Sequence, residues 1–130
     1  MKQYGSYTTL EQARELMRIV PVTSGDMSYV KTTMSGWQPQ LGLDVAVRHN
    51  LYSFRAGYVM PCWSLAALYA LLPKSVCLFR DEEGRFFCAY RRKRGEVASG
   101  AHVNPVNACY ELIMKQHNCL TEKEEETKNN

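Results

Sequence analysis

The sequence predicts an α+β fold in which a small antiparallel sheet, either a β-hairpin or a three-stranded meander, is packed by two to three helices. Three observations support this prediction. Apolar residues recur at helical spacing in three segments, and each segment follows a capping residue. Two short runs of β-forming residues flank the polar turn 81–84. Helices that cover one face of such a sheet make an α+β domain.

The composition fits a single globular domain over residues 1–120. The 130-residue chain is 45% hydrophobic and 22% charged, which is ordinary for a folded domain. No run approaches the roughly 20 apolar residues of a membrane span, and the first ten residues lack the apolar core of a signal peptide. We therefore expect a cytoplasmic protein that does not enter a membrane.

The first helix is expected over about residues 9–19. Thr8 and Glu11 match the capping box, in which a threonine hydroxyl caps the helix and a glutamate three residues later reaches back to it. Apolar residues then recur on one face until Pro21, which ends the helix.

The segment Pro61–Pro73 is the one around which the rest of the chain is organised. Ser64 is placed to cap a short amphipathic helix, which Pro73 ends. Trp63 precedes the cap and Leu68 follows it by four residues, the spacing of a hydrophobic staple. We therefore expect Trp63 to be buried.

Strands and a last helix follow. Residues 76–80 and 85–92 form the predicted hairpin, and 97–103 are a candidate third strand. Asn104 and Pro105 then match the N-cap and the first position of a helix.

Two regions carry weaker or different signals. Residues 28–33 alternate like a strand, but the rest of 27–60 is broken by glycine and proline, so we expect a lid, an insertion or a partner surface there. Residues 121–130 contain four Glu and two Lys but no apolar side chain. Burial of apolar side chains therefore cannot offset the conformational entropy that these residues would lose on ordering, so we predict a disordered acidic tail.

The residue types of metal and catalytic sites are present without their motifs. The three histidines (His49, His102 and His117) lack metal-ligand spacing, and the five cysteines are an odd number without CxxC spacing, which predicts buried free thiols. No Walker, GxGxxG, HExxH or nucleophile-elbow sequence occurs. We therefore expect no metal, no cofactor and no catalytic residue, that is, a protein that is not an enzyme.

One basic run is the candidate site for a polyanion, and it consists of Arg91, Arg92, Lys93 and Arg94. At a strand end and turn this run can neutralise phosphates of a nucleic acid. Alternatively, its charges only keep an exposed turn soluble and prevent an edge strand from pairing with another chain. Three nearby aromatic residues offer either a stacking platform for single strands or a core: Phe86, Phe87 and Tyr90. The element order from Ser64 to Leu120 is also that of a double-stranded-RNA-binding domain, but the lysine cluster of such domains is replaced by NPVNA.

Four sequence blocks carry a resemblance to a family: TLEQARELM, SGDMSY, PCWSLAALYALLP and NPVNACYELIMK. They resemble small hypothetical proteins of prophages and other mobile elements in gut anaerobic bacteria, where WSLxALxxLLP and NPVDACxEMI blocks bracket a β-hairpin. The resemblance covers the first helix and residues 61–119, but RFFCAYRR departs from the W-x-x-x-Y of that hairpin, and 31–60 have no counterpart. It implies fold and provenance and transfers no functional residue.

These observations lead to two functional hypotheses. The first is a binding protein of a mobile genetic element that acts through protein partners, with self-association as one way to cover exposed apolar residues in the middle segment, namely Trp37, Tyr52, Phe54 and Tyr58. The alternative is nucleic-acid binding through the basic turn 91–94.

Overall fold

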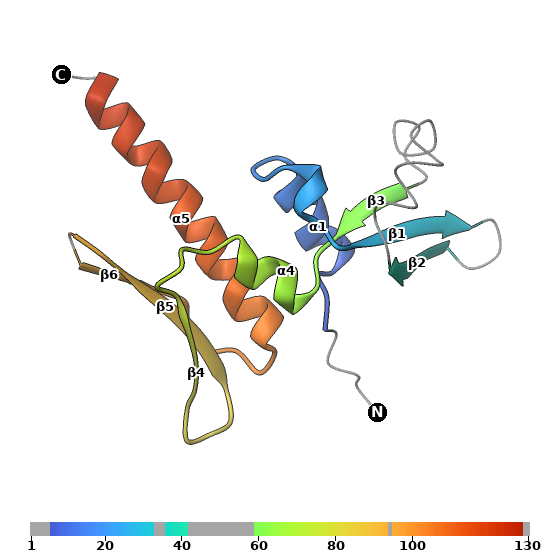
Figure 1. Cartoon of the computed structure of the whole chain (residues 1–130), viewed down its shortest axis with the longest axis horizontal. Coiled ribbons are helices and arrows are strands. Elements are labelled where there is room, and N and C mark those ends of the chain that lie inside the picture. The colour runs from blue at the N-terminus through green and yellow to red at the C-terminus, as the bar shows by residue number, and fades with distance from the viewer. Residues whose placement is uncertain (1–5, 33–35, 42–58, 94, 129–130) are drawn as a thin grey trace. The chain divides into compact units, whose positions relative to one another are not determined.

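The computed structural model describes residues 6–32, 36–41, 59–93 and 95–128, which form an α+β fold, as predicted (Figure 1). It contains two small antiparallel sheets, whereas the sequence predicted one. The elements are, in chain order, α1 (Leu10–Met17), the 3-10 helix η1 (Val22–Ser24), β1 (Met27–Thr32), β2 (Gly36–Leu41), β3 (Val59–Cys62), α4 (Leu65–Ala70), β4 (Cys77–Arg80), β5 (Phe86–Arg92), β6 (Gly95–Ala98) and α5 (Pro105–Lys128). They group into two compact units, Met1–Ala67 and Leu68–Asn130. No helix of the described residues is long and apolar enough to cross a membrane.

The first unit contains a three-stranded antiparallel sheet in the order β2-β1-β3, with α1 packed against β3. Tyr29 in the central strand pairs with Pro39 on one side and with Met60 on the other. The strand expected over 28–33 is confirmed as β1. Its partner strand β2 lies inside the segment 27–60 and β3 begins there, where the local sequence signals are weak, because strand pairing over long separations leaves little local trace.

The capping box of α1 is shifted by one residue from its expected position. Thr9 caps the helix: its hydroxyl accepts from the Gln12 amide at 3.2 Å, and the Gln12 side chain accepts from the Thr9 amide at 3.0 Å. Thr8 was the predicted cap, but it is fully buried, and its hydroxyl accepts instead from the amide of Trp63 at 3.2 Å. Thr8 therefore connects α1 to the end of β3.

The segment around Trp63 is confirmed as a buried and well-capped part of the fold. Trp63 is fully buried, and its indole Nε1 donates to the Ser24 hydroxyl at 2.9 Å. The Ser64 hydroxyl accepts from the Ala67 amide at 3.2 Å, which makes it the N-cap of α4. Asp26 accepts from the Ser64 amide at 2.9 Å and from its hydroxyl.

The second unit contains the predicted meander, an antiparallel sheet in the order β4-β5-β6. The two expected strands of the hairpin are confirmed, whereas the third begins earlier than expected, at Gly95, and ends at Ala98. Asp81 closes the β4–β5 turn, because its Oδ1 accepts from the amides of Glu83 and Arg85 at 2.9 and 2.8 Å. Gly84 in this turn has φ 81°, a left-handed conformation that suits glycine.

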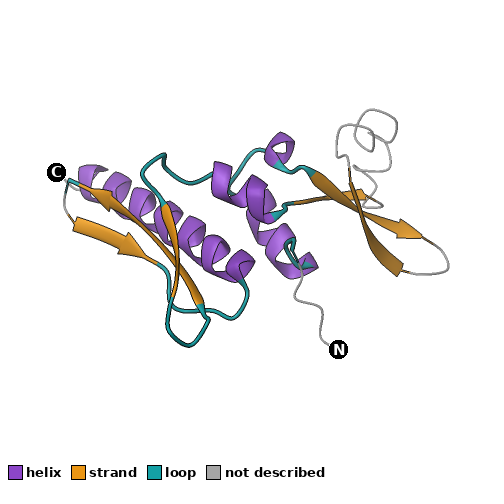
Figure 2. Cartoon of the chain, turned by 60° about the horizontal axis from the view of Figure 1, so that its bottom comes forward, coloured by secondary structure: helices purple, strands orange, loops and turns teal. Residues whose placement is uncertain are grey.

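The last helix, α5, lies along one face of this sheet (Figure 2) and contacts β5 and β6. Its start is as predicted: the Asn104 side chain accepts from the Val106 amide at 2.9 Å, and Pro105 is the first helical residue. The Cys88 thiol donates to the Ala108 carbonyl at 3.3 Å, so the Cys88 side of β5 is the one that faces α5.

The C-terminal part of α5 differs from the sequence prediction. The helix continues to Lys128 and so includes residues 121–128, which were expected to be disordered. Glutamate and lysine are good helix formers, and extending an existing helix avoids the cost of nucleation.

Three of the four aromatic residues that motivated the partner surface in the middle segment, Tyr52, Phe54 and Tyr58, lie outside the described residues, and so does the side chain of Trp37.

Candidate binding surface

The side of the sheet β4-β5-β6 that faces away from α5 is the candidate binding surface. Side chains alternate along a strand, and the strand register places those directly opposite each other on the same side. Cys77 opposes Ala89, Phe79 opposes Phe87, and Arg91 opposes Glu96. These residues alternate with Cys88, which faces α5. We call this set the outer face, and its members are Cys77, Phe79, Phe87, Ala89, Arg91 and Glu96.

An aromatic pair lies at one end of the outer face. The rings of Phe79 and Phe87 are stacked, with centroids 5.1 Å apart and planes inclined by 19°. Phe79 is 44% exposed although phenylalanine gains free energy from burial. The aromatic pair is therefore ready to contact an apolar partner without any rearrangement of the core.

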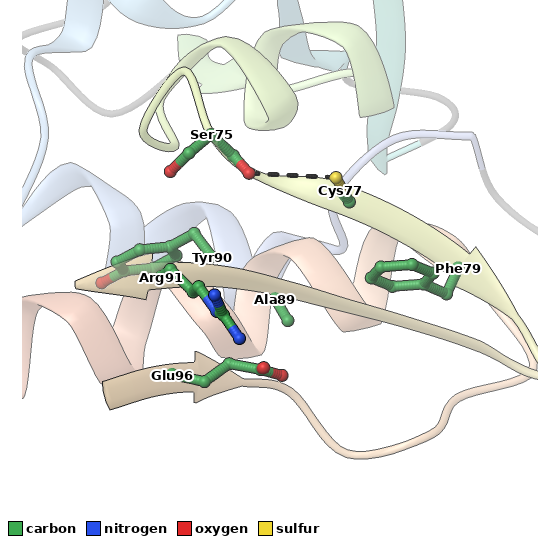
Figure 3. A pocket seen from close by; sticks show the side chains of 7 residues that line it. All are labelled: Ser75, Cys77, Phe79, Ala89, Tyr90, Arg91 and Glu96. Carbon is green, nitrogen blue, oxygen red and sulfur yellow. Dashed lines mark hydrogen bonds between the residues drawn. The ribbon is translucent and has the colours of Figure 1, made fainter.

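A hollow of about 330 Å³ lies beside this pair (Figure 3) and is lined by Ser75, Cys77, Phe79, Ala89, Tyr90, Arg91 and Glu96. Its polar end is formed by Arg91 and Glu96, and Phe79 forms a wall at the other end. The Cys77 thiol lies in its wall and makes a long contact of 3.9 Å with the Ser75 carbonyl. The hollow offers apolar contact together with one residue of each charge.

The structure places the predicted polyanion site at the far end of β5. Arg91 and Arg92 are the last residues of the strand, Lys93 follows in the turn, and all three are exposed. Arg94 lies outside the described residues. Arg91 shares the outer face with Glu96 directly opposite, so an acidic group is built into this end of the surface.

The two other arginines of the hairpin are engaged at its opposite end. Arg85 forms ion pairs with Asp81 at 3.2 Å and with Glu83 at 2.9 Å. The guanidinium of Arg80 lies over the Phe86 ring, 5.5 Å from its centroid. These contacts hold the β4–β5 turn and separate its arginines from the basic end.

The structure divides the three aromatic residues that the sequence suggested as a stacking platform. Phe87 lies on the outer face, whereas Phe86 and Tyr90 alternate with it and share the face of Cys88. Tyr90 is 6% exposed and also borders the hollow. Sequence reasoning missed Phe79 as the partner of Phe87. The turn at 81–85 was the available signal, because a turn of known length fixes which residues of the two strands stand opposite.

Several of the cysteines and histidines that the sequence offers for catalytic or metal sites are placed by the structure. Cys62, Cys88 and Cys109 are buried and Cys77 is exposed. A hydrogen bond with the Cys88 sulfur, together with burial, raises the pKa of Cys109, which keeps that thiol neutral. His102 is held by Glu111 at 2.6 Å. Within the part of the chain that the structure describes, no group of three His, Cys, Asp or Glu residues could hold a metal ion.

Comparisons with protein-family models, with curated proteins and with solved structures find no match to this chain. No functional residue can therefore be carried over from another protein. The outer face has to be interpreted from its own chemistry.

Proposed function

We propose that this chain is a non-enzymatic binding protein that contacts another protein through the outer face. The observation that supports this proposal most strongly is the stacked pair of Phe79, which is exposed, and Phe87, which is half-buried, on the sheet beside a hollow. Aromatic residues and arginine are enriched at protein interfaces, and apolar anchors that fit into a pocket contribute most of the binding free energy.

The charge of the outer face favours a protein over a nucleic acid as the partner. Arg91 is its one cation and Glu96 opposes it across the strands, so the face itself carries no net charge. A phosphate placed beside Arg91 would also meet the Glu96 carboxylate. A protein can instead present a complementary pair of charges around an apolar centre.

The experiment that tests this proposal is a capture from the native host with quantitative mass spectrometry. The wild-type chain is compared with Phe79→Asp and with Val103→Asp, the matched control, because Val103 is also an exposed apolar residue (55%) but lies off the outer face. We expect a protein that wild type and Val103→Asp retain and Phe79→Asp loses. Equal capture by all three chains would contradict the proposal.

Nucleic-acid binding through the basic turn is the second candidate, and one observation favours it. Arg91, Arg92 and Lys93 are exposed in succession at one end of the sheet. This candidate predicts salt-sensitive binding of DNA or RNA that disappears when residues 91–94 are replaced by Ser or Gln. A chain that passes through a polyanion column at low salt would exclude it.

A further inference from the structure

The outer face lies between two turns of opposite charge. The β4–β5 turn carries Asp81, Glu82 and Glu83, whereas Arg92 ends β5 and Lys93 begins the β5–β6 turn. The two turns lie at opposite ends of the sheet (Figure 1). They are separated by the seven residues of β5, or about 20 Å at the rise of an extended strand.

The exposed acidic groups at this end are Glu82 and Glu83, of which Glu83 pairs with Arg85 at 2.9 Å. Asp81 is occupied by the turn itself, as described above, and Arg80 and Arg85 offset part of the acidic charge. Glu82 is exposed, and the side chain of Glu83 is 72% exposed. Between the two charged ends lie the apolar residues of the outer face and its hollow.

This pattern is complementary to itself. A two-fold axis that lies between two facing outer faces and runs across their strands brings the acidic end of one copy to the basic end of the other, twice. The same rotation brings the exposed Phe79 of each copy to the hollow of the other, because the hollow lies next to Phe79 on the same face. Identical patches that contact each other reciprocally are the requirement for a two-fold dimer.

We infer that the outer face pairs with the outer face of a second copy of this chain, with each Phe79 inserted into the other copy's hollow. The inference rests on the proposed function and names its partner. With strands spaced about 4.8 Å apart, seven-residue β5 (about 20 Å) and four-residue β4 and β6 (about 13 Å each) cover roughly 220 Å² per copy. Stable interfaces bury about 800 Å² per partner, so the wild-type dimer is weak and sensitive to salt.

Two charge-reversed variants test the inference by sedimentation. One is Glu82→Lys/Glu83→Lys, which leaves the structural Asp81 in place. The other is Arg92→Glu/Lys93→Glu, which leaves the Arg91–Glu96 pair in place. Each variant alone has ends of like charge and should be a monomer. A 1:1 mixture again has opposite charges at both contacts. Because Arg80 and Arg85 add to the reversed charge of the β4–β5 turn instead of offsetting it, the heterodimer should be at least about tenfold tighter than the wild-type dimer at low salt.

The control mixture carries the same charge changes on α1, namely Glu11→Lys/Glu15→Lys with Arg14→Glu/Arg18→Glu. It should associate no more than wild type does. Phe79→Asp added to both hairpin variants should abolish the heterodimer, whereas Val103→Asp should not. Circular dichroism spectra verify that every variant is folded.

A hairpin mixture that stays monomeric, or that associates no better than the α1 mixture, overturns the inference. The proposed function survives that result if the host capture still finds a protein that depends on Phe79, and it fails with the inference if no such protein is found. Salt-sensitive binding of an oligonucleotide by a chain that stays monomeric would overturn the inference in favour of the nucleic-acid candidate.

Discussion

Glu111 on α5 is the residue that fixes the loop before that helix. Its Oε2 accepts from the Gly100 amide at 2.8 Å and contacts His102 Nε2 at 2.6 Å, and Lys115 Nζ lies 3.9 Å from Oε1. Burial opposes the charged form, but the hydrogen bonds from His102 and Gly100, together with the charge of Lys115, hold the pKa of Glu111 below its usual value.

A Glu111→Gln substitution should therefore change how stability depends on pH. A carboxyl whose pKa is lowered by folding stabilises the fold above its unfolded pKa of about 4.5, and this contribution is lost as the pH falls through the lower folded pKa. At neutral pH the variant should lose about 0.5–1.5 kcal/mol. Melting temperatures measured from about pH 6 to about pH 3 should fall more steeply for wild type. Parallel curves would contradict this role of Glu111.

Trp63 is the largest of the fully buried side chains, so its removal should be costly. Trp63→Ala should lower the free energy of unfolding by about 3–5 kcal/mol through the cavity it leaves. Trp63→Phe is the control, because it keeps a ring but loses the donor to Ser24 and so should cost less. Urea denaturation measures both, and an alanine variant as stable as the phenylalanine variant would show that the indole does not contribute to the core.

At the scale of elements, the sequence predicted what depends on neighbouring residues. The β4–β5 hairpin and the starts of α4 and α5 carry capping residues and a polar turn, which act within a few residues. The sheet β2-β1-β3 was only partly expected, because β3 joins β1 across about thirty residues. The N-cap of α1 is Thr9 and not the expected Thr8, because the Thr8 hydroxyl accepts a hydrogen bond from the Trp63 amide. No local sequence pattern shows this tertiary contact.

The candidate site was predicted in part for the same reason. The basic residues are visible as a run of sequence, and so are Phe86, Phe87 and Tyr90. Alternation along β5 separates Phe86 and Tyr90 from Phe87, but which of the two faces is covered depends on where α5 packs, and the sequence of β5 alone does not show this. Phe79 can be assigned to the outer face only from the strand register, which places it opposite Phe87.

The end of α5 should be dispensable for the stability of the fold. Residues 121–128 are helical but carry no apolar side chain to bury. A chain that ends at Leu120 should lose helical circular dichroism at 222 nm and keep its melting temperature. A drop of many degrees would show that this segment is held by contacts with the rest of the protein.

At the scale of the whole molecule, the expected single domain over residues 1–120 stays a prediction. The boundary between the two compact units falls inside α4, between Ala67 and Leu68, so unfolding of either unit disrupts that helix. We therefore expect one calorimetric transition, with equal calorimetric and van't Hoff enthalpies. Two separate transitions would show that the units are independent domains.

The central claim is that the outer face binds a second copy, and Cys77 reports on it directly. This thiol is exposed in the wall of the hollow, whereas Cys62, Cys88 and Cys109 are buried. Cys119 is first replaced by serine so that it does not contribute to the signal. The alkylation rate of Cys77 is then measured by mass spectrometry at increasing protein concentration. The rate should fall as copies pair, and Phe79→Asp should remove that fall. A Cys77 rate that is the same at every protein concentration would contradict the claim.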